Sequence, residues 1–498
     1  MKSIKTLSMY LPQYYRTPEN DEWWGEGFTD WMAVKDAKPI FRGHHQPKAP
    51  LDGNYYNLLE HSVMEWQAEL MKKYGVDGQC IYHYYFKEGR MTLQKPAENL
   101  LKWKDIDMPF CFCWANERWI RTWQFDPWAD KFRKGEIGEQ VLMEQKYGGR
   151  EDWEKHFEYL LPFFRDERYI KVNNSPVFAI MSPNDIYCLE EMMAYWKRRA
   201  SESGFRDIYF ILIGDTSFKG ADAILRHAPH AFYNLKMDMD KQGVFTFDYK
   251  QLWDRIIDEA PHPYCRTYFA GMPDCDDTPR RGKKGIVLEG FSVQAFYEGM
   301  VRLYQKSVSL GNEFVFINAW NEWGEGMYLE PDEEYGYQML EAVKRAQEDA
   351  MAEDLEQIPF DYESGYAKQM ISAENRSRKF QKFYKCLNKW MDNLEEGKYL
   401  CDYLSEKKIE TVAIYGCGAL GKHVLKELSG SNITVKYMID QHYNIGRSSL
   451  KVVNPEEHLE EVDAVIVTPI MEYENIENKL KGKIKADILS LEMIVYDI

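Results

Sequence analysis

The chain has 498 residues and a net charge of −17, and 45% of its residues are hydrophobic. This length exceeds what one hydrophobic core usually organises, so we expect at least two domains. The negative charge argues against a nucleic-acid-binding protein, which needs a basic surface to meet phosphates, and against a protein that binds anionic membranes.

No apolar run reaches 18 residues, so the sequence predicts no membrane-spanning helix. The N-terminal stretch MKSIKTLSMYLPQYY has no apolar segment typical of secretion signals, so we expect a cytoplasmic protein. The nine cysteines fit this compartment, because their number is odd and their spacing shows no disulfide framework. No spacing typical of metal ligands, of a serine-hydrolase elbow or of a P-loop appears, so we expect no metal site.

Short apolar runs of strand length alternate along the chain with helical patterns. The helical patterns cover residues 62–75, 152–166, 189–204 and 292–311. The predicted strands are residues 6–12, 78–86, 109–116, 176–182, 208–214, 231–237, 266–272 and 314–320. This alternation favours an α/β fold with a (β/α)8 TIM-type barrel over residues 1–352. A doubly wound open sheet is the structural alternative.

In such a barrel, active-site residues lie where the strands end and the loops begin. These positions are unusually polar or aromatic here. The candidate substrate-binding residues at or after these strand ends are Tyr10, Gln13, Trp24, His83, Tyr85, Trp114, Asn116, Glu117 and Asp215. Together they predict a cleft lined with aromatic and carboxylate side chains. A shift of one residue in the second strand would replace His83 and Tyr85 by Tyr84.

The stretch FVFINAWNEWGEGMYLEPD, residues 314–332, starts as a buried strand and runs into two carboxylates, Glu322 and Glu325. Two carboxylates in different environments can divide the acid and base roles of glycosidic cleavage. The neighbouring Trp320 could raise the pKa of one carboxyl group, and Asn321 could hydrogen-bond a sugar hydroxyl. Both are further candidate substrate-binding residues. The alternative is a pair of solvated carboxylates in a surface loop.

The chain changes character after the predicted barrel. Residues 353–408 are polar and charged, and we expect a helical connector there. Residues 409–498 begin again with a strand, a glycine-rich turn and a helix, which predicts a small Rossmann-like domain. The candidate cofactor-binding residues of this turn and of the next strand end are Gly416, Gly418, Gly421 and Asp440. They could hold a nucleotide or a nucleotide-sugar, or only form a tight turn in an interaction or regulatory module.

Residues 10–31, YLPQYYRTPENDEWWGEGFTDW, resemble the opening of the WbsX-like proteins, whose barrel is similar to that of the family 99 glycoside hydrolases. The resemblance continues through KPIFRGHHQPKAP, IYHYYF, FCFCWANERW and INAWNEWGEGMYLEPD. It implies a (β/α)8 barrel that acts on glycans and requires neither a metal nor another cofactor.

The resemblance also implies roles for the two carboxylates. In the endo-α-mannosidases of family 99, the first Glu of an E-W-x-E stretch helps the sugar's own 2-hydroxyl to attack, and the second is the acid/base. These positions are Glu322 and Glu325 here. Gly324 stands where those enzymes have a histidine, so mannose specificity is not implied. Many WbsX-like proteins are described as glycosyltransferases.

These observations predict a retaining (endo-)glycoside hydrolase that acts on a polysaccharide or oligosaccharide. Two alternatives stay open: a glycosyltransferase of surface-polysaccharide biosynthesis, such as that of O-antigen, capsule or exopolysaccharide, and a non-catalytic glycan-binding protein. The partner we expect is a glycan. The sequence does not give the sugar, the linkage or the oligomeric state.

Overall fold

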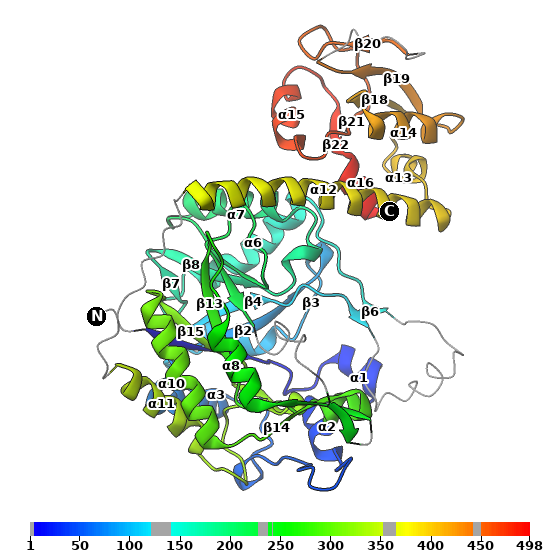
Figure 1. Ribbon diagram of the computed structural model, residues 1–498. Coiled ribbons are helices and arrows are strands. Elements are labelled where there is room, and N and C mark those ends of the chain that lie inside the picture. Colours follow the sequence, from blue (N-terminus) through cyan, green and yellow to red (C-terminus); the bar gives the residue numbers. More distant parts are fainter. Residues whose placement is uncertain (1–3, 121–140, 228–237, 242, 352–364, 442–449) are drawn as a thin grey trace. The chain divides into compact units, whose positions relative to one another are not determined.

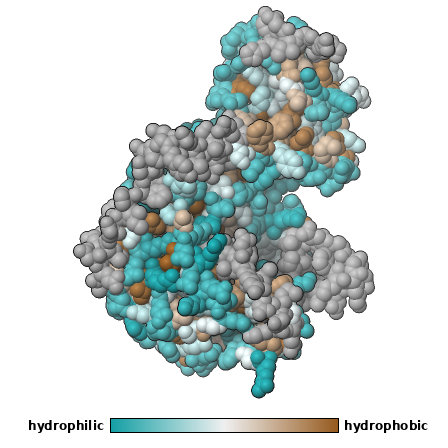
Figure 2. Space-filling model, viewed as in Figure 1, coloured by the Kyte–Doolittle hydropathy of each residue, from teal (hydrophilic) through white to brown (hydrophobic). Residues whose placement is uncertain are grey.

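The computed structural model describes residues 4–120, 141–227, 238–241, 243–351, 365–441 and 450–498. The chain divides into two compact units, Met1–Ser364 and Gly365–Ile498 (Figure 1). In the view of Figure 2, the exposed face of the first unit is mainly hydrophilic, in keeping with the high content of charged residues. None of the described helices is long and apolar enough to cross a lipid bilayer.

The first unit is built on a closed barrel of parallel strands. Its strands in chain order are β1 (Lys5–Tyr10), β2 (Gly78–Tyr85), β4 (Phe110–Trp114), β8 (Ser175–Ile180), β9 (Tyr209–Ile213), β10 (Ala223–Arg226), β13 (Arg266–Gly271) and β15 (Phe314–Ile317). Each strand pairs with the next, and the ring closes because Ser8 of β1 pairs with both Gln79 of β2 and Ile317 of β15. The predicted (β/α)8 barrel is therefore confirmed.

The sixth strand of the barrel differs from the prediction. The predicted strand at 231–237 lies outside the described residues, and β10 fills the sixth position between β9 and β13. This strand is only four residues long, and nine residues separate it from the end of β9. From the sequence alone it therefore looks like part of the loop that follows β9. The other predicted strands overlap the observed ones.

Helices surround the barrel (Figure 1). They are α1 (Pro18–Trp24), α2 (Asp30–Asp36), α3 (His61–Tyr74), α4 (Lys95–Lys102), α6 (Arg150–Phe164), α7 (Leu189–Glu202), α8 (Tyr249–Asp258), α9 (Thr278–Arg281), α10 (Val293–Ser309) and α11 (Gln338–Met351). Their ends follow local chemistry. The Ser292 hydroxyl accepts a hydrogen bond from the Ala295 N–H at the start of α10, and Gly75 ends α3 with a φ of 77°.

Short strands extend the loops around the barrel. They are β3 (Met91–Thr92), β5 (Trp119–Ile120), β6 (Val141–Met143), β7 (Lys171–Val172), β11 (Asp238–Lys241), β12 (Val244–Asp248), β14 (Ile286–Glu289), β16 (Asn321–Glu322) and β17 (Met327–Tyr328). The strands β16 and β17 form a hairpin that follows β15, with a single helical turn, η6 (Trp323–Glu325), between them. This hairpin carries Glu322 and Glu325.

The second unit has its own sheet and core. Its strands β18 (Thr411–Tyr415), β19 (Thr434–Ile439), β20 (Val452–Val453), β21 (Ala464–Val467) and β22 (Asp487–Ser490) form a parallel sheet in the order β20-β19-β18-β21-β22. Its helices are α12 (Gly365–Glu395), α13 (Leu400–Glu406), α14 (Ala419–Leu428), α15 (Tyr473–Leu480) and α16 (Leu491–Asp497).

The expected connector at 353–408 contributes to this second unit. Residues 353–364 lie outside the described part of the chain, and α12 and α13 follow. Cys386 and Trp390 of α12 are buried in the same apolar cluster as Val412 of the sheet. The helices therefore supply part of the core of the second unit.

A fragment of residues 1–364 should fold without the second unit, because each described cluster of buried apolar residues draws its members from one unit only. We expect a cooperative thermal transition, seen by circular dichroism, within about 4 °C of the barrel transition in the full chain. A fragment that aggregates or shows no cooperative transition would contradict two independent cores.

Candidate active site

The loop that carries Glu322 and Glu325 is fixed to the first strand of the barrel. The Trp320 N–H donates to the Met9 carbonyl at 2.8 Å. The Asn321 side chain accepts from the Leu11 N–H at 2.8 Å and donates to the Leu11 carbonyl at 3.0 Å. These bonds hold the loop at the carboxyl ends of β1 and β15, where a barrel of this kind places its active site.

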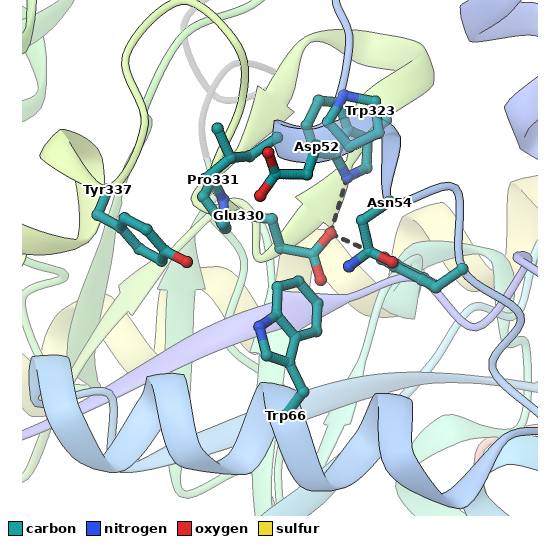
Figure 3. A pocket seen from close by; sticks show the side chains of 10 residues that line it. Asp52, Asn54, Trp66, Trp323, Glu330, Pro331 and Tyr337 are labelled. Carbon is teal, nitrogen blue, oxygen red and sulfur yellow. Dashed lines mark hydrogen bonds between the residues drawn. The ribbon is translucent and has the colours of Figure 1, made fainter.

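A second anchor is the buried carboxylate of Glu330. It accepts hydrogen bonds from the indole N–H groups of Trp320 and Trp323 at 2.9 and 2.7 Å, from the Tyr56 hydroxyl at 2.8 Å and from the Gln67 amide at 2.7 Å. The bond from Trp323 is drawn in Figure 3. Burial raises the pKa of Glu330 to about 7, and the four donors oppose this shift. Glu330 therefore fixes the positions of Trp320 and Trp323, the two tryptophans nearest to Glu322 in the sequence.

These two anchors correct two expectations from the sequence. The side chains of Trp320 and Asn321 are completely buried, and both are used to hold the loop. They support the carboxylates and do not face a sugar.

One arginine connects the two carboxylates of the loop. The Arg280 guanidinium donates to Glu322 at 3.0 Å and to Glu325 at 2.7 Å. It also donates to both oxygens of Asp30, at 3.1 and 2.9 Å. The side chains of Arg280, Asp30 and Glu322 are at most 8% exposed, whereas that of Glu325 is 24% exposed. A single buried cation thus holds three carboxylates together.

The two carboxylates differ in their electrostatic environment. Burial raises the pKa of Glu322 to about 8, and the nearby charges of Glu325 and Asp30 act in the same direction. The positive charge of Arg280 opposes this shift. Glu322 is therefore the more buried carboxyl group of the pair, and Glu325 is the more accessible one.

The absence of a side chain at Gly324 follows from this cluster. A Cβ atom at this position would lie 2.6 Å from Arg280 Nε and 2.7 Å from Asp30 Oδ2. Contacts under 3.0 Å to two buried, paired groups leave no room for a side chain. The glycine at position 324 is thus matched to Arg280 and Asp30.

Strand β2 presents the opposite face to the one predicted. His83 Nε2 lies 2.8 Å from His156 Nε2 on α6, and the Tyr85 ring stacks on His156 with centroids 3.7 Å apart. These two side chains therefore point outward, towards α6. Tyr82 and Tyr84 point the other way: burial first, and then the charge of Glu322, raises the pKa of both hydroxyls. His83 and Tyr85 therefore face the helix layer, and Tyr84, the alternative considered for this strand, lies on the other face of β2.

The residues predicted on the third strand are mainly structural. The Trp114 indole donates to the Tyr85 carbonyl at 3.0 Å, and its ring packs against Trp196 of α7. Asn116 is completely buried and accepts from the Ser182 N–H at 2.8 Å. Glu117 is exposed and accepts from the Ser182 hydroxyl at 2.6 Å. Trp114 and Asn116 thus hold neighbouring strands and loops together.

The other predicted site residues lie in different surroundings. The Tyr10 hydroxyl donates to Gln67 on α3 at 2.8 Å, so this side chain faces the helix layer. Trp24 is buried beside Phe28, and Asp215 is exposed with Thr216 as a donor. Gln13 is 4% exposed, and its amide nitrogen has no hydrogen-bond partner among the described residues. Of these, Tyr10 is the one that the structure turns away from the barrel mouth.

Sequence reasoning missed Arg280 and Asp30. Arg280 lies 250 residues from Asp30 and 42 residues from Glu322 along the chain. It stands next to Arg281 in a polar loop, and such a pair usually indicates a solvated surface. Only the fold brings these charges together.

The glycine-rich turn of the second unit has a clear local structure. Gly416 has a φ of 101°, and a Cβ at Gly421 would lie 1.9 Å from the Gly416 carbonyl oxygen. The Asp440 carboxylate accepts a hydrogen bond from the Cys417 N–H at 2.7 Å. Gly418 has open space where its Cβ would be. Gly416 and Gly421 are explained by the turn itself, and Asp440 fixes it.

Comparisons with known proteins agree on one family for the first unit. The model of the family described as glycosyltransferase WbsX matches residues 6–343. Two proteins named "Uncharacterized protein WxcX", from two strains of Xanthomonas campestris pv. campestris, are 31% and 30% identical over 354 residues. The alignments cover 68% of this chain and 49% of those proteins, so the chain spans about half the length of these relatives.

Solved structures of low sequence identity also match. The family 99 endo-α-mannosidase from Bacteroides thetaiotaomicron has a TM-score of 0.42 and 13% identity, over 70% of this chain and 98% of that one. A chain titled "Glycoside hydrolase-like protein" has a TM-score of 0.42 and 10% identity, over 70% and 94%.

Replacing Arg280 by methionine should destabilise the barrel strongly, because three buried or half-buried carboxylates would lose their shared cation. Breaking a buried ion pair costs about 3–5 kcal/mol. The measurement is the free energy of unfolding from urea titrations, followed by tryptophan fluorescence.

Arg302→Met is the matched control, because Arg302 pairs with Asp254 on the exposed surface. Such pairs contribute no more than about 1 kcal/mol. Equal losses of unfolding free energy in the two variants would contradict the inference that Arg280 holds the three carboxylates together.

Proposed function

The chain belongs to the family described as glycosyltransferase WbsX, and we propose that it is a glycan-active enzyme whose barrel cleaves a glycosidic bond with retention. One observation carries this proposal. Two carboxylates of unequal burial, Glu322 and Glu325, meet on one guanidinium at the carboxyl ends of the barrel strands. Carboxylates with different environments can divide the acid and base steps of glycosidic cleavage.

Glu322 is suited to be the base. A sugar hydroxyl is a very weak acid, and a carboxylate with a raised pKa removes its proton more effectively than an ordinary one. Burial raises the pKa of Glu322 to about 8. In this proposal Glu322 takes the proton of the 2-hydroxyl, whose oxygen then attacks the anomeric carbon from within the same ring.

Glu325 is suited to be the acid and later the base for water. Its side chain is more exposed than that of Glu322, so a leaving oxygen and a water molecule can both reach it. It gives its proton to the leaving oxygen as the anomeric bond breaks and a 1,2-anhydro sugar forms. Water then loses a proton to Glu325 and opens that ring, while Glu322 returns its proton to the 2-oxygen. Two inversions give net retention.

Glycosyl transfer is the second candidate, and the name of the family favours it. The same two carboxylates would serve, with an acceptor hydroxyl in place of water in the second step. Within the second unit, and independently of this reaction, the open space at Gly418 at the start of α14 would suit the phosphates of a nucleotide. A screen of polysaccharides with and without sugar nucleotides separates hydrolysis from transfer. Binding of a glycan without turnover in either arm would indicate the third possibility, a non-catalytic glycan-binding protein.

The roles of the two carboxylates can be tested by changing the leaving group. Glu325→Gln should lose about 10²–10⁴-fold in rate on natural glycans and much less on aryl glycosides, whose phenol leaves without a proton. Glu322→Gln should fail on both, because activation of the 2-hydroxyl is needed in each case. Rates are measured on both substrates, and product stereochemistry by NMR.

The control for these variants is Glu298→Gln, which changes an exposed residue of α10 and should leave the rate unchanged. Inversion at the anomeric carbon, or equal rescue of both site variants, would contradict the assigned roles.

The raised pKa of Glu322 also predicts the dependence on pH. A base must be ionised, so kcat/KM should rise with pH by up to about tenfold per unit and level off near pH 8. A pH profile from 5 to 9 on the activated substrate measures this limb. A fall in rate between pH 6 and 8 would instead mean that Glu322 acts in its protonated form.

A further inference from the structure

A cavity of about 190 Å³ lies next to the hairpin that carries Glu322 and Glu325, beside α3 and the start of α11 (Figure 3). Its lining includes Trp66 of α3, Tyr337 just before α11, and Asp52 and Asn54 of the segment between α2 and α3. One wall is formed by Trp323 and Glu330, so the cavity adjoins the support of the carboxylate pair. The site proposed for catalysis does not use it.

The walls of this cavity are largely aromatic. Trp66 is half-buried and projects from its helix towards Glu330, and the Tyr337 ring points inward from the opposite side (Figure 3). Tyr337 is 37% exposed, and its ring stacks on Tyr74 of α3 with centroids 6.1 Å apart, which holds it at the edge of the cavity. Aromatic rings of this kind offer apolar faces to ligands whose rims are polar.

Several polar groups around the cavity remain available. Within the part of the chain that the structure describes, the Asp52 carboxylate, the Asn54 amide, the Trp66 indole N–H and the Tyr337 hydroxyl make no hydrogen bond to protein. Glu330 differs, because four donors already use its two oxygens. The cavity thus offers both donors and acceptors to a ligand.

The backbone directs one of these groups inward. Asp52 has a φ of 54°, in the left-handed region that residues with a side chain seldom adopt, and its carboxylate points to the cavity (Figure 3). Aspartate adopts this conformation more readily than most residues, and here it forms a turn with Gly53, which has a φ of 64°.

We propose that this cavity is a binding subsite for one neutral sugar ring of a glycan. Pockets for drug-sized ligands have about 300–1,000 Å³, so this smaller volume suits a single ring. Aromatic walls with separate donors and acceptors match the apolar faces and hydroxyl rim of a pyranose. The described lining has no lysine, arginine or histidine and contains two carboxylates, so it disfavours uronic acids and sugar phosphates. This proposal rests on the proposed function only for the idea that the ligand is a glycan.

The position of the subsite connects it with the reacting pair. Trp323 forms part of the cavity wall and lies between Glu322 and Glu325 in the sequence. A sugar bound here would hold the rest of a glycan beside the barrel mouth. We therefore expect the subsite to act on KM for long glycans and to leave kcat for short substrates unchanged.

The experiment measures binding without turnover. Full-length Glu325→Gln is titrated with methyl α-glucoside, α-galactoside, α-mannoside and N-acetylglucosaminide by saturation-transfer NMR, with methyl glucuronide as the anionic probe. We expect at least one neutral glycoside to bind. The signal should fall at least tenfold when Trp66→Ala or Asn54→Ala is added, and it should persist with Asn388→Ala, which changes an exposed residue of α12. Asn54→Ala keeps the test valid if Trp66→Ala fails to fold.

The outcomes separate this subsite from the proposed function. Binding that Asn54→Ala removes, in a chain that turns over no glycan, would support the subsite and contradict the proposed function. Binding of none of these glycosides, equal binding of the glucuronide, or binding that neither variant weakens would overturn the subsite even if the enzyme is active.

Discussion

The arrangement of the candidate site depends on the burial of Arg280. Three carboxylates gather around this one guanidinium, and none of Asp30, Glu322 and Arg280 could remain buried without the others. Three carboxylates on one cation are not fully compensated, and burial together with this imbalance raises the pKa of Glu322. A carboxylate of raised pKa is a stronger base once it has lost its proton, which is the role proposed for Glu322.

Glu330 is a second buried carboxylate, and it supports the loop that carries Glu322 through hydrogen bonds. Glu330 has neutral donors in place of a cation, and two of them are the indoles on either side of the Asn321–Glu322 segment. Hydrogen bonds from Asn321 to Leu11 then join this loop to β1. The position of Glu322 is therefore set by strand ends and buried polar contacts, and solvent has little part in it. Such a rigid support is what a site needs to hold reacting groups within a fraction of an ångström.

The sequence predicts the barrel well because its strands and helices alternate, and each strand is mainly buried. The same property limits what can be predicted of the site. All eight residues of β2 are buried, since one face meets the barrel interior and the other meets helices, so the pattern of polarity does not show which face His83 and Tyr84 occupy. The pair Glu322 and Glu325 stands out because it is local in the chain. Arg280 and Asp30 are not local, and only their spatial neighbours explain them.

The lack of a side chain at Gly324 has a consequence for comparing relatives. Because a Cβ there would occupy the space of Arg280 and Asp30, a histidine at 324 and this arginine–aspartate pair exclude each other in the same backbone. Substitutions at these three positions should therefore be inherited together across the family, as alternative sets. The residues at positions 30, 280 and 324 of a new family member would then show which of the two sets it has, before its substrate is known.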